Sequence, residues 1–100
     1  MISHDLLNKA LTQYLGYTNN PYPCECKECI KEQYGEEVGR ELVDKIEEII
    51  NVLDQLKPDW NLLSLEDSAN WSKKQIHRIY PELNHDSLNA LAWLFTWWWK

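Results

Sequence analysis

The longest pattern of apolar and polar positions covers residues 36–56. Apolar residues in this stretch recur at spacings of three and four: Val38, Leu42, Ile46, Ile49, Leu53 and Leu56. Such a stripe predicts an amphipathic helix with one buried face. Pro58 follows, and it disfavours helix at the residue before it, so the helix should end by about Leu56. Gly39 lies on the apolar side, and the close approach of a neighbouring helix would explain a glycine there.

Other helices are predicted on both sides of this central one. Ser3 is a good N-cap for a helix from His4 to about Leu15, which Gly16 would end. Residues 24–34 form a further short segment, because Cys26 and Cys29 would share a face on a helical turn.

The second half of the chain predicts two more helices. Ser64 would cap a helix from 65 to about 80, ended by Pro81, and its poor patterning suggests a break at 70–72. Asn84 would cap a last helix from 85 to about 98.

No stretch alternates as a half-buried strand would. We therefore predict an all-α fold: one domain of residues 1–100, with four to five helices packed around the helix at about 36–56. We expect Trp60, Trp93 and Phe95 in the core, and we expect the apolar connector with Leu62 and Leu63 to fold back onto it.

Charge is concentrated in the middle of the chain. Residues 24–54 hold ten acids and four bases, which accounts for the whole net charge of −6. This excludes the basic footprint of a nucleic-acid-binding protein and is compatible with a basic protein partner. Four acids of the central helix form one ridge at spacings of four, three and four: Glu37, Glu41, Asp44 and Glu48.

Tryptophan is unusually frequent, with six residues among one hundred. Trp97, Trp98 and Trp99 would project in three directions from a helix end, about 100° apart. At least one should be exposed or held in an interface, such as that of a homodimer, because Trp is enriched at interfaces.

Three cysteines, Cys24, Cys26 and Cys29, lie within six positions. Thiolates suit zinc, but a structural zinc site needs four ligands. The fourth would be His4, His77, His85 or a residue of another chain. The alternatives are three reduced cysteines that pack a turn and redox chemistry, although the chain lacks the βαβ pattern of a thioredoxin-like protein.

No catalytic motif is complete: the chain has no glycine-rich phosphate loop and no HExxH sequence, so we expect no enzyme. It has no apolar run long enough to span a membrane and no signal-peptide pattern, which favours the cytoplasm.

The composition favours a small acidic binding protein. It fits the type of a bacterial toxin-immunity protein, which blocks a basic toxin such as a nuclease by steric occlusion. We expect the acidic ridge to face the basic partner, with Trp97 or Trp99 as an aromatic anchor at the rim. The alternative is a structural or adaptor module built on a zinc site of the three cysteines.

Overall fold

The computed structural model describes residues 3–17, 21 and 23–99, and these form an all-α domain of five helices. The helices are α1 (His4–Leu15), α2 (Lys27–Tyr34), α3 (Glu36–Asp54), α4 (Leu65–Ile79) and α5 (His85–Trp99). The fold class is therefore as the sequence predicts, and no strand occurs in the described part of the chain.

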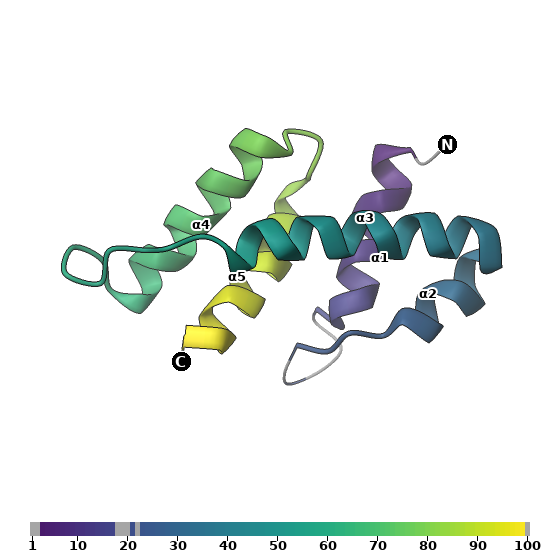
Figure 1. The fold of residues 1–100 in the computed structure, drawn as a ribbon, viewed down its shortest axis with the longest axis horizontal. Helices are drawn as coiled ribbons and strands as arrows, with labels where there is room; N and C mark the ends of the chain where they lie inside the picture. Colours follow the sequence, from purple (N-terminus) through teal and green to yellow (C-terminus); the bar gives the residue numbers. More distant parts are fainter. Residues whose placement is uncertain (1–2, 18–20, 22, 100) are drawn as a thin grey trace.

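Helix α3 runs along the long axis of the molecule, which measures 45 × 27 × 20 Å (Figure 1). Helices α1 and α2 lie toward one end of α3, whereas α4 and the C-terminal half of α5 lie toward the other. The closest helix pairs are α4 with α5, α2 with α3, and α1 with α5. The long helix is thus covered along most of its length by short helices, which bury the middle of its apolar stripe.

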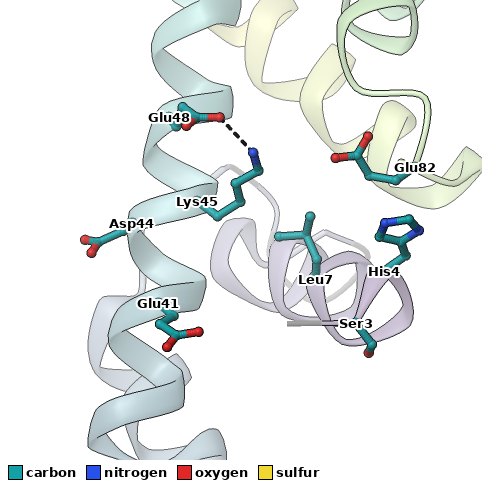
Figure 2. Close-up of a pocket in the computed structure, with 8 residues that line it drawn as sticks. All are labelled: Ser3, His4, Leu7, Glu41, Asp44, Lys45, Glu48 and Glu82. Carbon is teal, nitrogen blue, oxygen red and sulfur yellow. Dashed lines mark hydrogen bonds and ion pairs between the residues drawn. The ribbon is translucent and has the colours of Figure 1, made fainter. Parts of the chain in front are cut away.

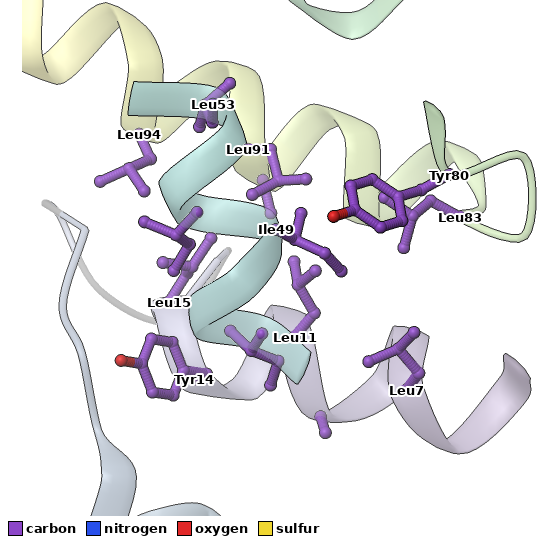
Figure 3. Packing of buried hydrophobic residues seen from close by; sticks show 14 of the residues in the cluster. Leu7, Leu11, Tyr14, Leu15, Ile49, Leu53, Tyr80, Leu83, Leu91 and Leu94 are labelled. Atoms are coloured by element: carbon purple, nitrogen blue, oxygen red, sulfur yellow. The ribbon is translucent and has the colours of Figure 1, made fainter. Parts of the chain in front are cut away.

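The core lies where α1, α3 and α5 meet (Figure 3). Leu11 of α1, Ile49 of α3 and Leu91 of α5 are buried there, and Phe95 is completely enclosed. The predicted stripe of α3 is buried except at its ends, because Val38 is 40% exposed and Leu56 is half-buried. The short partners of α3 do not reach far enough to cover both ends.

The predicted helix signals are confirmed by the hydrogen bonds. The hydroxyl oxygens of Ser3 and Ser64 accept from the backbone N–H groups three residues later, and the side chain of Asn84 accepts from the N–H of Ser87. Gly16 ends α1 in the left-handed conformation, with φ of 71°. Because capping depends only on neighbouring residues, it could be predicted from the sequence.

Gly39 allows α2 to pack directly against α3. A Cβ atom at this position would lie 2.8 Å from the Cα of Lys31 and 3.2 Å from the carbonyl oxygen of Ile30. No side chain fits in that space, so the close approach expected from the sequence is confirmed.

Three expectations about the second half are wrong. Helix α4 is continuous, without a break at 70–72, because its buried face consists of Ser68, Ser72 and Ile76 and the small serines pack closely. Trp60 is 41% exposed instead of belonging to the core, and Leu62 is 79% exposed. The connector folds back only in part: Pro58 is buried and Leu63 is half-buried, while Leu62 remains in water. Trp93 is half-buried against Tyr17, with ring centroids 5.8 Å apart.

A buried polar contact joins α1 to the turn between α4 and α5. The side-chain amide of Asn8, 5% exposed, donates to the carbonyl oxygens of His4 and Glu82 at 2.7 and 3.1 Å. Its oxygen accepts from the N–H of Asn84 at 2.8 Å and from the hydroxyl of Ser87 at 2.6 Å. One side chain therefore satisfies four polar groups and fixes the turn against α1.

Candidate functional site

An open groove of about 460 Å³ lies between the N-terminal end of α1, the middle of α3 and the turn before α5 (Figure 2). We call it the acidic groove, and eight residues line it: Ser3, His4, Leu7, Glu41, Asp44, Lys45, Glu48 and Glu82. Glu41, Glu48 and Glu82 place three carboxylates around a single lysine, while the carboxylate of Asp44 points away from it.

The groove uses three of the four predicted ridge acids. Glu41, Asp44 and Glu48 line it, while Glu37 lies one turn before them on the exposed face of α3 and outside the groove. Helical spacing of three and four places these acids in one row, because such positions are neighbours on a helix surface. The ridge expected from the sequence is therefore present. Glu41 and Glu48 lie on the groove side of α3, whereas the carboxylate of Asp44 points away from the groove (Figure 2).

Glu82 is the carboxylate that sequence reasoning missed. It lies in the turn between α4 and α5, and its backbone carbonyl is held by Asn8. Figure 2 shows it across the groove from α3, above His4. No local sequence signal connects Glu82 with Glu41, since they meet only through the packing of the turn against α1.

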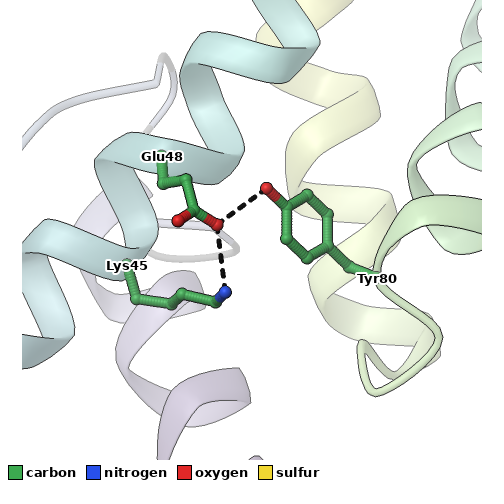
Figure 4. A network of polar contacts seen from close by, with 3 residues as sticks. All are labelled: Lys45, Glu48 and Tyr80. Carbon is green, nitrogen blue, oxygen red and sulfur yellow. Dashed lines mark hydrogen bonds and ion pairs between the residues drawn. The ribbon is translucent and has the colours of Figure 1, made fainter.

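Glu48 is the one groove carboxylate with strong partners inside the protein. Its Oε2 accepts from the ammonium of Lys45 at 3.0 Å and from the hydroxyl of Tyr80 at 2.8 Å (Figure 4). Lys45 also lies 5.0 Å from the centre of the Tyr80 ring. These contacts hold the side chains of Glu48 and Lys45 against the wall of the groove.

The same contacts shift two pKa values. Hydrogen bonds from Lys45 and then from Tyr80 lower the pKa of Glu48, because both stabilise the carboxylate. Burial, followed by the hydrogen bond to Glu48, raises the pKa of Tyr80 to about 12. At neutral pH, Glu48 is therefore ionised and Tyr80 is a hydrogen-bond donor.

The other three carboxylates have no such partners. Among the described residues, the side chains of Glu41, Asp44 and Glu82 take part in no ion pair within 4.0 Å. Glu41 and Glu82 place two such negative charges on the two sides of the groove, and a concave wall focuses their field, which attracts cations. The groove is suited to bind lysine or arginine side chains.

The predicted aromatic anchors lie elsewhere. Trp97 and Trp99 are 44% and 43% exposed, and neither lines the acidic groove. Together with Trp60 and Trp98 they form what we call the tryptophan cluster, at the C-terminal end of α5. The rings of Trp60 and Trp99 are 5.3 Å apart, so the connector partly covers the helix end.

The three cysteines gather at the start of α2, but two of them are bonded to each other. Cys26 and Cys29 form a disulfide, and the thiol of Cys24 donates to the carbonyl oxygen of Tyr14 at 3.6 Å. In this state neither bonded sulfur is a thiolate ligand. Across residues 3–17, 21 and 23–99, no three His, Cys, Asp or Glu residues are grouped so that they could hold a metal ion. The zinc site stays a prediction for the reduced protein.

No helix in the described part of the chain has the length and apolar character needed to cross a membrane. Comparison with protein-family models, curated proteins and solved structures finds no match for this chain. The functional argument therefore depends on the residues themselves.

Proposed function

We propose that this chain is a small non-catalytic binding protein of the cytoplasm that occludes a basic protein partner through its acidic groove. The observation that carries the proposal is the pair of carboxylates, Glu41 and Glu82, that lack an ion-pair partner among the described residues and lie on the two sides of an open cavity. Asp44, which also lacks an ion-pair partner in that part of the chain, lies beside Glu41 on α3. This surface best supports the role of a toxin-immunity protein, whose partner would be a basic toxin such as a nuclease.

Occlusion needs no chemistry in the groove. Basic side chains of the partner would enter between α3 and Glu82, while Glu37 would extend the contact along α3. Complementary charges of this kind speed association and fix orientation, more than they add to affinity. The partner's active site would then be covered instead of chemically altered.

The test is an association measurement with the partner, identified by crosslinking and mass spectrometry. The double variant Glu41→Lys/Asp44→Lys should slow association about tenfold or more at low salt and flatten its salt dependence. The matched control is Glu32→Lys/Asp54→Lys, which changes the net charge equally at exposed positions outside the groove.

The control separates a local from a general charge effect. If both double variants slow association equally, net charge alone drives the encounter and the groove has no special role. If neither variant changes binding, the proposal fails. The intact protein should also inhibit the partner's activity at a one-to-one ratio.

A second candidate is self-association through the tryptophan cluster. The four indoles are 39–44% exposed and lie together at one end of the molecule, where large aromatic surface would be buried by a second copy. Analytical ultracentrifugation should then detect a dimer that Trp97→Glu/Trp99→Glu dissociates. A monomer at all concentrations would exclude it.

A further inference from the structure

The disulfide between Cys26 and Cys29 lies on the surface at the first turn of α2, away from the acidic groove. Cys29 is exposed and Cys26 is half-buried. Thiol–disulfide exchange requires an incoming thiolate to reach one of the two sulfurs. Cys29, the more exposed of the two residues, is the one that such a thiolate can approach.

The two sulfurs differ in their relation to the helix. Cys26 is the N-cap residue of α2, and in the disulfide its side chain makes no capping hydrogen bond. Backbone N–H groups at a helix N-terminus lack partners and stabilise a negative charge placed there. Glu25 and Glu28 oppose this effect, but only Cys26 of the pair lies at the helix end, so it is the leaving thiolate.

The segment before α2 keeps the pair in place. The N–H groups of Cys24 and Cys26 donate to the carbonyl oxygens of Leu15 and Tyr14 at 3.0 and 3.1 Å. On the other side, α2 is held against α3 at Gly39. The Cα atoms of the pair are 5.3 Å apart, within the range that a disulfide requires. Both sulfurs therefore stay close to each other when the bond is open.

We infer that Cys26 and Cys29 form a reversible thiol–disulfide exchange site for an external dithiol. The incoming thiolate attacks Sγ of Cys29, the bond between the two protein sulfurs breaks, and its electron pair leaves on Sγ of Cys26. The second thiol of the dithiol then loses its proton and attacks the dithiol sulfur that is bonded to Cys29. The bond to Cys29 breaks, and Cys29 leaves as a thiolate. Two electrons and two protons pass to the protein, and the dithiol becomes a disulfide.

The test uses the Cys24→Ser variant, in which Cys26 and Cys29 are the remaining cysteines. The variant is equilibrated with mixtures of glutathione and glutathione disulfide. The pair should open and close reversibly, with the oxidised fraction set by the ratio of glutathione squared to glutathione disulfide. Alkylation after acid quenching, followed by mass spectrometry, measures this fraction. In the early mixed disulfide, glutathione should be on Cys29 at least about threefold more often than on Cys26.

The double variant Cys24→Ser/Cys26→Ser is the control, since its single remaining thiol can take glutathione but cannot close a ring. Circular dichroism verifies that both variants keep their helices. Separate glutathionylation of the two cysteines in Cys24→Ser would overturn the inference. A disulfide that stays closed in the folded protein under excess dithiol would also overturn it. Uptake of one Zn²⁺ per reduced chain that blocks reoxidation would do the same.

Discussion

The acidic groove and the tryptophan cluster lie at opposite ends of α5 and are built in opposite ways. Near the start of α5, polar contacts from Asn8 and Tyr80 fix a turn and a charged wall. At its end, aromatic rings pack against one another at tilted angles at the edge of the core. A 15-residue helix is about 22 Å long, so the two surfaces can act independently.

The comparison teaches that exposure has a different meaning at each end. In the groove, the carboxylates are in contact with water and their negative charges repel one another. A basic partner would reduce that repulsion. In the cluster, the indoles keep about two-fifths of their surface in water although each could be buried. The two ends of α5 therefore differ most in how much their exposed side chains contribute to the free energy of unfolding.

The largest effect should come from the buried aromatic residue beside the cluster. Phe95→Ala should lower the free energy of unfolding by about 3–5 kcal/mol, because it leaves a cavity in contact with Trp71 and Trp99. Trp98→Ala, at a residue 39% exposed, should cost about 1 kcal/mol or less. Urea titration measures both. Equal losses of unfolding free energy would mean that the exposed indoles stabilise the fold and are not a surface available for a partner.

At the groove end, the largest effect should come from Asn8. Asn8→Ala should cost about 2–3 kcal/mol, because it leaves the buried polar groups of the turn without partners. The exposed Asn51→Ala should change stability by about 0.5 kcal/mol or less. Thermal unfolding compares them. An Asn8 variant as stable as the control would show that apolar packing alone positions Glu82.

The N-terminal half of α3, which carries Glu37 and Glu41, is positioned by the contact at Gly39. Gly39→Ala should destabilise by about 1–3 kcal/mol, since the new methyl group would overlap the backbone of Lys31. Arg40→Ala, next to it on the exposed face, should have an effect below about 0.5 kcal/mol. A stabilised Gly39→Ala protein would contradict the close approach, because alanine is the better helix former.

The smallest effect should come from the hydrogen bond between Tyr80 and Glu48. Tyr80→Phe should cost about 0.5–1 kcal/mol at neutral pH. The lowered pKa of Glu48 means that this contribution is present above the ordinary carboxylate pKa and is lost as the pH falls through the lower folded value. The raised pKa of Tyr80 means that it is also lost as the pH rises from 10.0 to about 12.

Stability curves against pH for the wild type and Tyr80→Phe test this dependence. Tyr34→Phe is the matched control, since the hydroxyl of Tyr34 donates to the neutral amide oxygen of Gln13 at 2.6 Å. Its cost should not change between neutral and acidic pH. A Tyr80→Phe cost that is also constant in acid would show that Glu48 is not the partner that matters.

Local patterns determined the fold class. The stripe of α3, the caps at Ser3, Ser64 and Asn84, and the stop at Gly16 each depend on residues within one or two helical turns. Their geometry therefore follows from spacing along the chain. The ridge of α3 and the exposure of at least one terminal Trp could be predicted in the same way.

The connector and the cysteines could not be predicted so well. Trp60 is a large aromatic residue of a kind that often packs in cores, and its exposure follows from where the connector lies after α3 ends. The spacing of Cys26 and Cys29 predicted that they share a helical turn, but it did not predict that they bond to each other; α2 beginning at Lys27 brings the pair together. Composition is the same for either outcome, so it could not decide between them.

The sequence by itself determined four to five helical segments, the caps at Ser3, Ser64 and Asn84, and the acidic and aromatic character of two surfaces, because these depend on residue types at short spacing. Only the tertiary structure decided that Glu82 faces Glu41 across a groove and that the indoles gather at the far end of α5. The physical reason is that Asn8 and the turn at Glu82 are 74 positions apart. Contacts over such a separation depend on how whole helices pack, which no local pattern encodes.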